Sequence, residues 1–402
     1  MKMNKAQPLK PAAASAAKAW LSPSRRSDVP PFMVMDVMAA AARIEEAGGR
    51  VVHMEVGQPA APAPSTAIAA AKAALEGGRI GYTEALGIPS LRARISRHYA
   101  ERYGARVDPA RIVVTTGSSA GFILAFLALF EPGDRVAVAE PGYPPYRHIL
   151  TALGCEPVPI PISAATRWAL TVEALMTAHR QKPLAGVLAA SPANPTGTML
   201  DAAHLAALVR ACEAAGIKFI SDEIYHGLDY AFAAETAAKL SVEAVVINSF
   251  SKYFCMTGWR VGWMVVPNAL LRAVERLQQN LAISVPTLSQ VAAEAAFEGR
   301  AEMEAVKRGY VENRKILIEG LPKAGLDRFL PADGAFYLYA DVSRFSDDSF
   351  AFAKKMLEET HVAATPGVDF DPVRGKQFIR LCYAGSREDM HEAVTRIARW
   401  LK

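Results

Sequence analysis

Short apolar runs alternate with amphipathic stretches through the middle of this 402-residue chain. A strand is predicted in each of six segments, at residues 111–119, 132–146, 185–197, 217–225, 244–252 and 259–266. Several of these runs are apolar at consecutive positions, which is typical of strands that helices cover on both faces. Helical stretches at 121–130 and 201–216 separate them. The alternation predicts an α/β fold built on a central sheet.

The two ends of the chain follow a different pattern. Residues 31–60 predict a helix and a short extended piece, and residues 300–402 predict long amphipathic helices with short strands. A chain of this length exceeds one small core. We therefore expect residues 61–295 to form a large domain, and residues 31–60 and 296–402 to form a small domain together.

Charge and composition bear on whether the protein binds nucleic acid or a membrane, and on its cellular compartment. The basic residues within 1–30 account for the whole net charge of +5, so the folded body is neutral and offers no nucleic-acid face. Residues 1–30 are expected to be a flexible N-terminal arm. No run approaches the ~18 apolar residues of a membrane span, so no membrane partner is expected. The four cysteines form no CxxC pair, which favours the reducing cytoplasm.

Unusual polar residues follow the predicted strands. They are Ser118 with Ser119, Tyr143, Asn194, Asp222 and Lys252. Sites in open α/β sheets form at the carboxyl ends of strands, so these side chains are expected to lie close together.

Two of these positions have a structural alternative to a functional role. "TTGSSAGF" ends a strand and begins a helix at Ser118 and Ser119, which suits a phosphate or plain N-capping. Asp222 in "SDEIY" could bind a cation or a protonated ring nitrogen, and the structural alternative is a solvated Asp in a turn at the strand end. Tyr225, three residues later, provides a hydroxyl group. No metal site is expected, because no group with metal-ligand spacing accompanies Asp222.

Lys252 at the end of an apolar run carries the strongest signal. "SFSK" matches the S-x-x-K motif of serine β-lactamases, but their S-D-N and K-T-G partners do not occur in this chain. The other use of a buried lysine is to form an imine. Pyridoxal 5′-phosphate explains the whole set, since its aldehyde bonds a lysine, its phosphate suits a helix terminus and its ring nitrogen needs an acid.

With these motifs in this order, the chain resembles a fold-type I pyridoxal-phosphate aminotransferase of the class I/II, aspartate aminotransferase-like family. The resemblance covers about residues 30–400 and rests on "YTEALGIPSLR", "ASPANPTG", "SDEIY", "SFSKYFCMTGWRVGW" and "IRLCYAG". It implies a mixed, mostly parallel sheet and a homodimer with shared active sites. It also implies ping-pong transfer of an amino group between an L-amino acid and a 2-oxo acid.

The resemblance further implies how the cofactor ring is held. Lys252 would be the Schiff-base lysine and the proton shuttle, and Asp222 would pair with the pyridinium nitrogen. Tyr225 and Asn194 would donate hydrogen bonds to the ring 3′-oxygen. Tyr143 would stack on the ring.

Phosphate and substrate would be held by a second set of residues, again by resemblance. The phosphate would contact Ser118, Ser119, Ser249 and Arg260. Tyr82 would reach the phosphate of the partner subunit. Arg380 would clamp the α-carboxylate of the substrate, helped by the Gly57 backbone and by Asn194.

Two alternatives to an aminotransferase remain open on the sequence. A C–S β-lyase would retain nearly every residue named above. A regulator that senses the cofactor would carry a DNA-binding module, and only about 30 residues without such a pattern precede the body. The donor amino acid is not specified, although the apolar segments 30–36 and 283–285 favour hydrophobic, aromatic or small side chains. Phe336 is expected in the core or facing the pocket.

Overall fold

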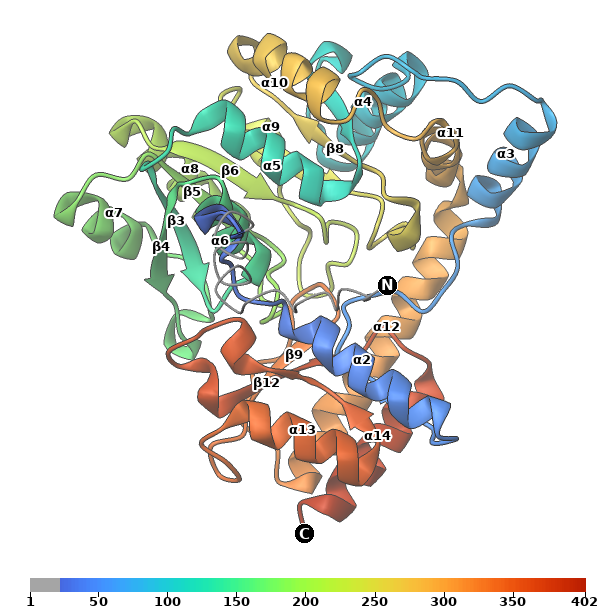
Figure 1. The fold of residues 1–402 in the computed structure, drawn as a ribbon, viewed down its shortest axis with the longest axis vertical. Coiled ribbons are helices and arrows are strands. Elements are labelled where there is room, and N and C mark those ends of the chain that lie inside the picture. Colours follow the sequence, from blue (N-terminus) through green and yellow to red (C-terminus); the bar gives the residue numbers. More distant parts are fainter. Residues whose placement is uncertain (1–21) are drawn as a thin grey trace, which may run out of the picture.

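The computed structural model describes residues 22–402, so the first 21 residues of the predicted arm lie outside the described part. The chain forms a seven-stranded sheet in the order β2-β8-β7-β6-β5-β3-β4 (Figure 1). Its strands are β2 (Ile112–Thr115), β3 (Arg135–Glu140), β4 (Glu156–Pro161), β5 (Gly186–Ala190), β6 (Lys218–Asp222), β7 (Val245–Ser249) and β8 (Gly262–Val265). All pairs are parallel except those of β8, which runs antiparallel to both neighbours. The α/β prediction is confirmed, and the sheet is mixed and mostly parallel.

Helices cover both faces of this sheet, which explains the continuous apolar runs. Phe219 of β6 and Val246 of β7 face one hydrophobic cluster, whereas the next residues, Ile220 and Ile247, face another. The helices around the sheet are α4 (Pro89–Tyr103), α5 (Gly117–Leu129), α6 (Pro144–Ala152), α7 (Val172–Gln181), α8 (Ala202–Ala215), α9 (Ala237–Leu240) and α10 (Asn268–Leu281). Since successive side chains of a strand point to opposite faces, both sets must be apolar.

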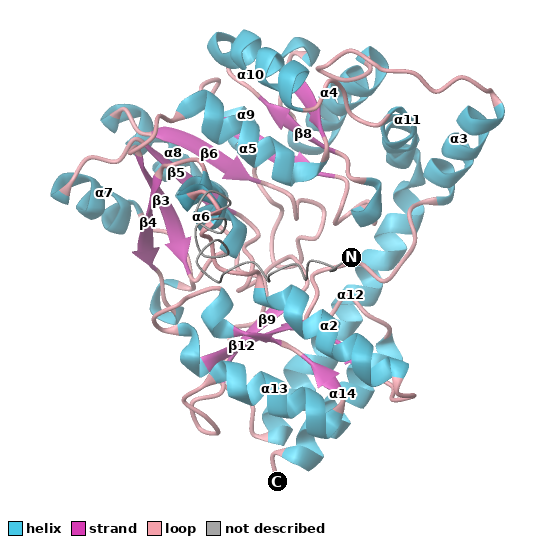
Figure 2. Cartoon of the chain, in the orientation of Figure 1, coloured by secondary structure: helices cyan, strands magenta, loops and turns pink. Residues whose placement is uncertain are grey.

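A smaller group of strands and helices lies below the large sheet in Figure 2. The antiparallel strands β11 (Thr365–Pro366), β12 (Phe378–Cys382) and β9 (Tyr337–Asp341) form one sheet, and β1 (Val52–His53) pairs in parallel with β10 (Val362–Ala363). The helices here are α2 (Met33–Glu46), α12 (Arg300–Gly320), α13 (Ser349–Thr360) and α14 (Arg387–Trp400). Segments from both ends of the chain therefore meet in this part.

The remaining helices pack along one side of the molecule. They are α3 (Ser65–Glu76) and α11 (Thr287–Ala296), which lie side by side (Figure 1). Within residues 22–402, no helix combines the length and the apolar character that a membrane crossing requires.

Two strands differ from the sequence prediction. The predictions omitted β4, whose sequence "EPVPIP" carries prolines at alternate positions. Glu156 donates its N–H to Asp134, while the prolines lack this group, and β4 pairs only with β3 at the edge of the sheet. The strand expected at 259–266 begins at Gly262, because Thr257–Trp259 form a 3-10 turn and Arg260 has a positive φ of 50°.

Gln290 of α11 joins two segments in the interior of the protein. Its side chain is fully buried, its Oε1 accepts from the Ile88 N–H at 2.8 Å, and its Nε2 donates to Thr83 Oγ1 and the Val285 carbonyl, both at 2.9 Å. We expect Gln290→Leu to lower the free energy of unfolding by about 2–4 kcal/mol, because it leaves buried backbone groups without partners.

The measurement is chemical denaturation of the variant beside the wild type. Gln279→Leu is the matched control, because Gln279 is exposed on α10 and its Nε2 is 3.4 Å from Glu275 Oε1. We expect a change of about 0.5 kcal/mol or less there. An unchanged transition in Gln290→Leu would contradict the role given to this side chain.

Candidate active site

The predicted site residues follow neighbouring parallel strands of the large sheet. Tyr143 follows β3 and Asn194 follows β5, while Asp222 ends β6. Ser249 ends β7, and Lys252 comes three residues later. Because these strands are parallel, their carboxyl ends lie at one edge of the sheet.

Asp222 is buried and accepts two hydrogen bonds. Its Oδ1 accepts from the Ile224 N–H at 3.1 Å, and its Oδ2 accepts from the hydroxyl of Tyr146. Burial raises the pKa of Asp222 to about 6, and both hydrogen bonds oppose this rise. The carboxyl group is therefore ionised at neutral pH. The sequence analysis missed Tyr146, which lies in the first turn of α6, three residues after the N-cap residue Tyr143.

Lys252 places its amine among aromatic rings and a backbone carbonyl. Its Nζ donates to the Gly57 carbonyl at 2.6 Å. The same nitrogen lies 5.7 Å from the centre of the Tyr225 ring and 5.9 Å from that of Phe336. Burial lowers the pKa of Lys252 to about 8, so the free amine is far more accessible near neutral pH than in an exposed lysine.

Gly57 occupies a position that tolerates no side chain. A Cβ atom there would lie 1.8 Å from the hydroxyl oxygen of Tyr337. That hydroxyl is hydrogen bonded to the hydroxyl of Tyr225 at 2.7 Å. The sequence analysis did not identify Tyr337, because its contact with Tyr225 depends on tertiary packing that the local pattern does not encode.

Arg380 is a buried cation on β12, with 2 % of its surface exposed. Its Nη1 donates to Asn194 Oδ1 at 2.9 Å, and its Nη2 donates to Thr365 Oγ1 at 3.1 Å. The guanidinium carbon lies 4.5 Å from the centre of the Tyr337 ring and 4.8 Å from that of Phe370. Its Nε has no hydrogen-bond partner, and no carboxylate within residues 22–402 forms an ion pair with it. A buried cation in this state suits an anionic ligand.

The first turn of α5 is open to an anion. The N-cap residue Thr116 makes no side-chain hydrogen bond to this turn, which contains Ser118 and Ser119. The Arg260 guanidinium lies against it, since a Cβ atom on Gly117 would be 2.5 Å from Arg260 Nη2. Free N–H groups and a cation at a helix N-terminus form an anion site. Capping by a serine, the alternative considered for the sequence, is absent from this turn.

Ser249 lies close to the first turn of α5, because its partner strand β8 packs against that turn. It pairs with Gly262 of β8, where a Cβ atom would be 3.1 Å from the Ser118 nitrogen. Its hydroxyl donates to Ser251 Oγ at 2.9 Å and accepts from the Ser251 N–H at 3.0 Å. Ser251, which the sequence analysis missed, thus takes part in the same group of hydroxyls.

Two predicted residues lie at the margin of the site. Tyr143 is half-buried, and its ring centre lies 5.2 Å from that of Tyr146 and 5.8 Å from that of Phe32. Tyr82 is 84 % exposed in the segment between α3 and α4. The structure gives Tyr82 no ring contact or side-chain hydrogen bond within residues 22–402, so one chain does not bring it to the other site residues.

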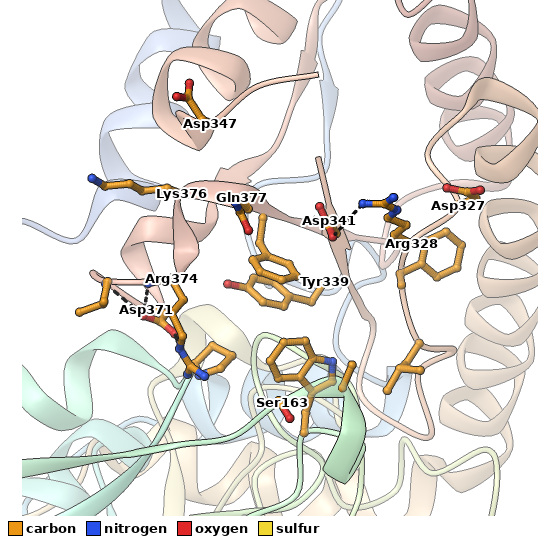
Figure 3. A pocket seen from close by; sticks show the side chains of 17 residues that line it. Ser163, Asp327, Arg328, Tyr339, Asp341, Asp347, Asp371, Arg374, Lys376 and Gln377 are labelled. Carbon is orange, nitrogen blue, oxygen red and sulfur yellow. Dashed lines mark hydrogen bonds and ion pairs between the residues drawn. The ribbon is translucent and has the colours of Figure 1, made fainter. Parts of the chain in front are cut away.

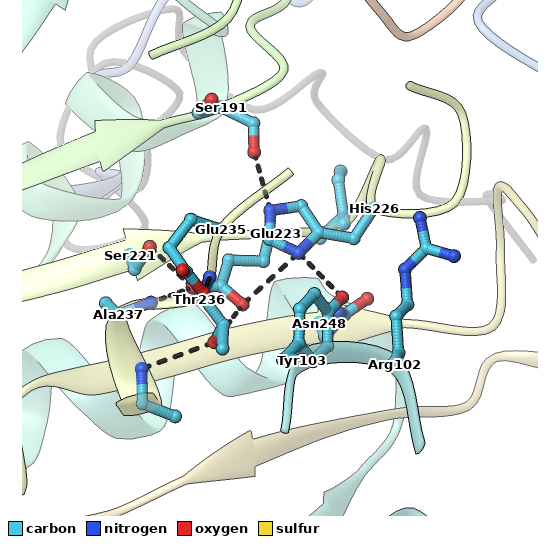
Figure 4. A network of polar contacts seen from close by, with 12 residues as sticks. Arg102, Tyr103, Ser191, Ser221, Glu223, His226, Glu235, Thr236, Ala237 and Asn248 are labelled. Carbon is cyan, nitrogen blue, oxygen red and sulfur yellow. Dashed lines mark hydrogen bonds and ion pairs between the residues drawn. The ribbon is translucent and has the colours of Figure 1, made fainter. Parts of the chain in front are cut away.

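A buried polar network supports the site from behind (Figure 4). The Glu223 carboxylate accepts from Ser221 Oγ at 2.9 Å, from Thr236 Oγ1 at 2.8 Å and from the Ala237 N–H at 2.8 Å. Burial raises the pKa of Glu223 to about 8. His226, three residues later, places Nδ1 3.5 Å from Glu223 Oε2.

One large cavity lies away from the candidate site. A cavity of about 890 Å³ lies between the loop of Trp168 and the strands that carry Tyr339 and Phe378 (Figure 3). None of the predicted site residues lines it. The site is therefore recognised by its chemistry.

Comparison with known proteins identifies the family. The family model described as aminotransferase class I and II matches residues 50–397. A valine–pyruvate aminotransferase of Mycobacterium tuberculosis is 52 % identical over 380 residues, covering 94 % of this chain and 97 % of that protein.

Solved structures agree with this assignment. A crystal structure of an aminotransferase from Mycobacterium tuberculosis superimposes with a TM-score of 0.92 at 51 % identity, covering 94 % of this chain and 99 % of that one. Aspartate aminotransferase from Thermus thermophilus, crystallised with maleate, superimposes with a TM-score of 0.89 at 30 % identity, covering 94 % and 99 %. The chain belongs to the class I and II aminotransferases, enzymes that transfer an amino group between an amino acid and a keto acid.

Proposed function

We propose that this enzyme uses pyridoxal 5′-phosphate, bound covalently through Lys252, and works by a ping-pong mechanism. The family is generally dependent on this cofactor. The observation that carries the proposal is the Lys252 amine, whose pKa burial lowers to about 8, at the same strand edge as a buried Asp222. The uncapped turn of α5 beside Arg260 suits a phosphate. The residues present thus fit the three functional parts of the cofactor.

Each part of the cofactor has its own proposed set of residues. Ser118, Ser119, Ser249 and Arg260 hold the phosphate, and the hydroxyl group of Ser251 assists them. Asp222 pairs with the ring nitrogen, and Tyr146 orients its carboxylate. Tyr225 and Asn194 donate to the ring 3′-oxygen, and Tyr143 packs on the ring.

The chain's residues then divide the work of proton transfer. The bound cofactor supplies an electron sink for the electrons released at the substrate Cα. Asp222 keeps the ring nitrogen protonated through an opposite charge. With the cofactor bound, Lys252 as a free amine would remove the proton from the substrate Cα as a base, and as an acid would return it to the cofactor carbon on the other side of the substrate nitrogen. Its lowered pKa suits both roles near neutral pH.

Arg380 orients the substrate for this step. Its guanidinium binds the α-carboxylate, with Asn194 and the Gly57 backbone beside it. The rings of Tyr337 and Phe370 hold the guanidinium in place. A fixed carboxylate directs the Cα–H bond towards Lys252, which lowers the entropic cost of the reaction.

A homodimer completes the proposed site. The large apolar side chains Ile80, Tyr82, Leu281 and Ile283 are 41 %, 84 %, 59 % and 54 % exposed. Hydrogen bonds from Thr287 to Gly81 and from Gln290 to Thr83 hold their two segments together. We propose that a second copy covers this surface and that Tyr82 reaches the phosphate in the partner's site.

The proposed substrates are an apolar amino acid such as valine and pyruvate as the amino acceptor. This rests on the name of the relative that is 52 % identical. Phe32, edge-on to the Tyr143 ring, supports it by adding apolar surface beside the site.

The domain division and the location are further parts of the proposal. Residues 31–60 and 296–402 form the small domain, and residues 61–295 form the large cofactor-binding domain. Four free, buried cysteines support a place in the reducing cytoplasm.

Lys252→Ala removes the proposed nucleophile and base. We expect kcat to fall by about 10³-fold or more, and the visible absorbance of the bound cofactor to disappear. Lys315→Ala is the control, because Lys315 has 72 % of its side chain exposed and pairs with Glu319 at 3.8 Å. Turnover of Lys252→Ala at the wild-type rate would end the proposal.

Gly117→Ala tests the phosphate seat. Gly117 has a φ of +72°, and an added Cβ would push against Arg260, so we expect affinity for the cofactor to fall about 10-fold or more. Gly104→Ala imposes similar backbone strain at a φ of +63° but meets no atom within 4 Å. Titration of both apoenzymes with cofactor compares them. Equal losses in the two variants would refute the contact as the cause.

The donor and the reaction outcome are tested in one half-reaction. Valine, alanine, aspartate or a cysteine conjugate is added to the cofactor-loaded enzyme without any oxo acid. We expect valine to bleach the visible band and to release one equivalent of its 2-oxo acid, until pyruvate restores the band. A preference for aspartate would refute the apolar donor. Continued release of thiol and pyruvate would identify a β-lyase.

A further inference from the structure

His226 links three segments of the chain behind the site (Figure 4). It follows Tyr225 directly and is 6 % exposed. Its Nε2 lies 3.0 Å from the Ser191 carbonyl oxygen, and its Nδ1 lies 2.8 Å from the hydroxyl oxygen of Tyr103 at the end of α4. The imidazole therefore bridges two strand-end loops and a helix.

One tautomer satisfies both bonds. A carbonyl oxygen only accepts, so Nε2 carries the hydrogen and donates it to Ser191. Burial lowers the pKa of His226 to about 3, so the ring is neutral and Nδ1 keeps its lone pair. The Tyr103 hydroxyl then donates to Nδ1. The ring is held at both nitrogens and cannot turn without breaking a buried hydrogen bond.

Ser191 is the point at which two functional loops are joined. It directly follows β5, its N–H donates to the Asp222 carbonyl at 3.1 Å, and its Oγ accepts from the Leu200 N–H at 3.0 Å. With the bond from His226, every polar group of Ser191 has a partner. Three residues later the chain presents Asn194, whose Oδ1 accepts from Arg380.

We propose that His226 is a positioning residue that sets the placement of Asn194 relative to Tyr225. Both residues donate to the ring 3′-oxygen under the proposed function, on which this inference rests. Their two donors come from different loops, at the ends of β5 and β6. The bond from His226 to Ser191 ties these loops together, so its loss lets the Asn194 amide move away from the ring oxygen.

Two substitutions of His226 test the hydrogen bonds of its two ring nitrogens separately. His226→Gln extends an amide N–H towards the position of Nε2 and can still donate to Ser191. His226→Asn is shorter, so it can accept from Tyr103 near the position of Nδ1 but cannot reach Ser191. A residue that merely fills the core would make no such distinction.

The readout is the pH at which the visible band of the cofactor-loaded enzyme changes. Hydrogen-bond donors stabilise the negatively charged ring oxygen, so losing one favours the protonated state of the bound cofactor. We expect His226→Asn to raise this midpoint by about 0.5–1 pH unit and to weaken cofactor affinity about 3- to 10-fold. His226→Gln is expected to stay near the wild type. Tyr103→Phe is expected to lower thermal stability without moving the midpoint.

The outcomes are decisive in each direction. An unshifted midpoint in folded His226→Asn, or equal shifts in the Asn and Gln variants, would overturn the inference. If His226→Asn does not fold, the double variant Tyr103→Phe with His226→Leu is used, because it fills the space and leaves no unpaired hydroxyl. It is expected to show the same shift, and an unshifted midpoint there overturns the inference too. A wild type without any visible band would instead refute the proposed function.

Discussion

The structure depends on burying two cations without an ion-pair partner in the described part of the chain, Lys252 after β7 of the large sheet and Arg380 on β12 of the small sheet. Lys252 and Arg380 form no ion pair within the described residues 22–402. Backbone carbonyls, an amide oxygen and aromatic rings solvate them instead. Such groups are costly to bury, and the apolar clusters on both faces of the large sheet offset that cost. The same cost makes the site receptive to an anionic ligand.

Close backbone approach is the second constraint. Gly57 leaves room for the Tyr337 hydroxyl, and Gly117 leaves room for the Arg260 guanidinium. Gly262 lets β8 approach the first turn of α5, which brings Ser249 to the same point. Since each of these contacts would clash with a Cβ atom, the geometry of the site is built into the backbone as much as into the polar side chains.

A third feature is the set of buried hydrogen bonds that position the site residues. Tyr146 orients Asp222, and the network of Glu223 and His226 joins the loops that follow β5 and β6. Under the proposed function these residues support the site and do not bind the ligand themselves. They hold the residues that do, which is how a site on loops attains the precision of a rigid scaffold.

The sequence by itself determined the α/β class, six strands of the large sheet, the family, and the candidate residues at strand ends, because local apolar pattern and motif spacing encode them. It could not reveal β4, whose alternating prolines contradict strand propensity but suit an edge. Nor could it reveal Tyr146, Tyr337 or Ser251, since an aromatic or hydroxyl residue in a regular element has the same pattern whether it packs or supports a site. Tertiary structure decided the contacts of Tyr146 with Asp222 and of Tyr337 with Tyr225 and Gly57, because these residues are distant in the sequence and meet only when the strands and loops pack.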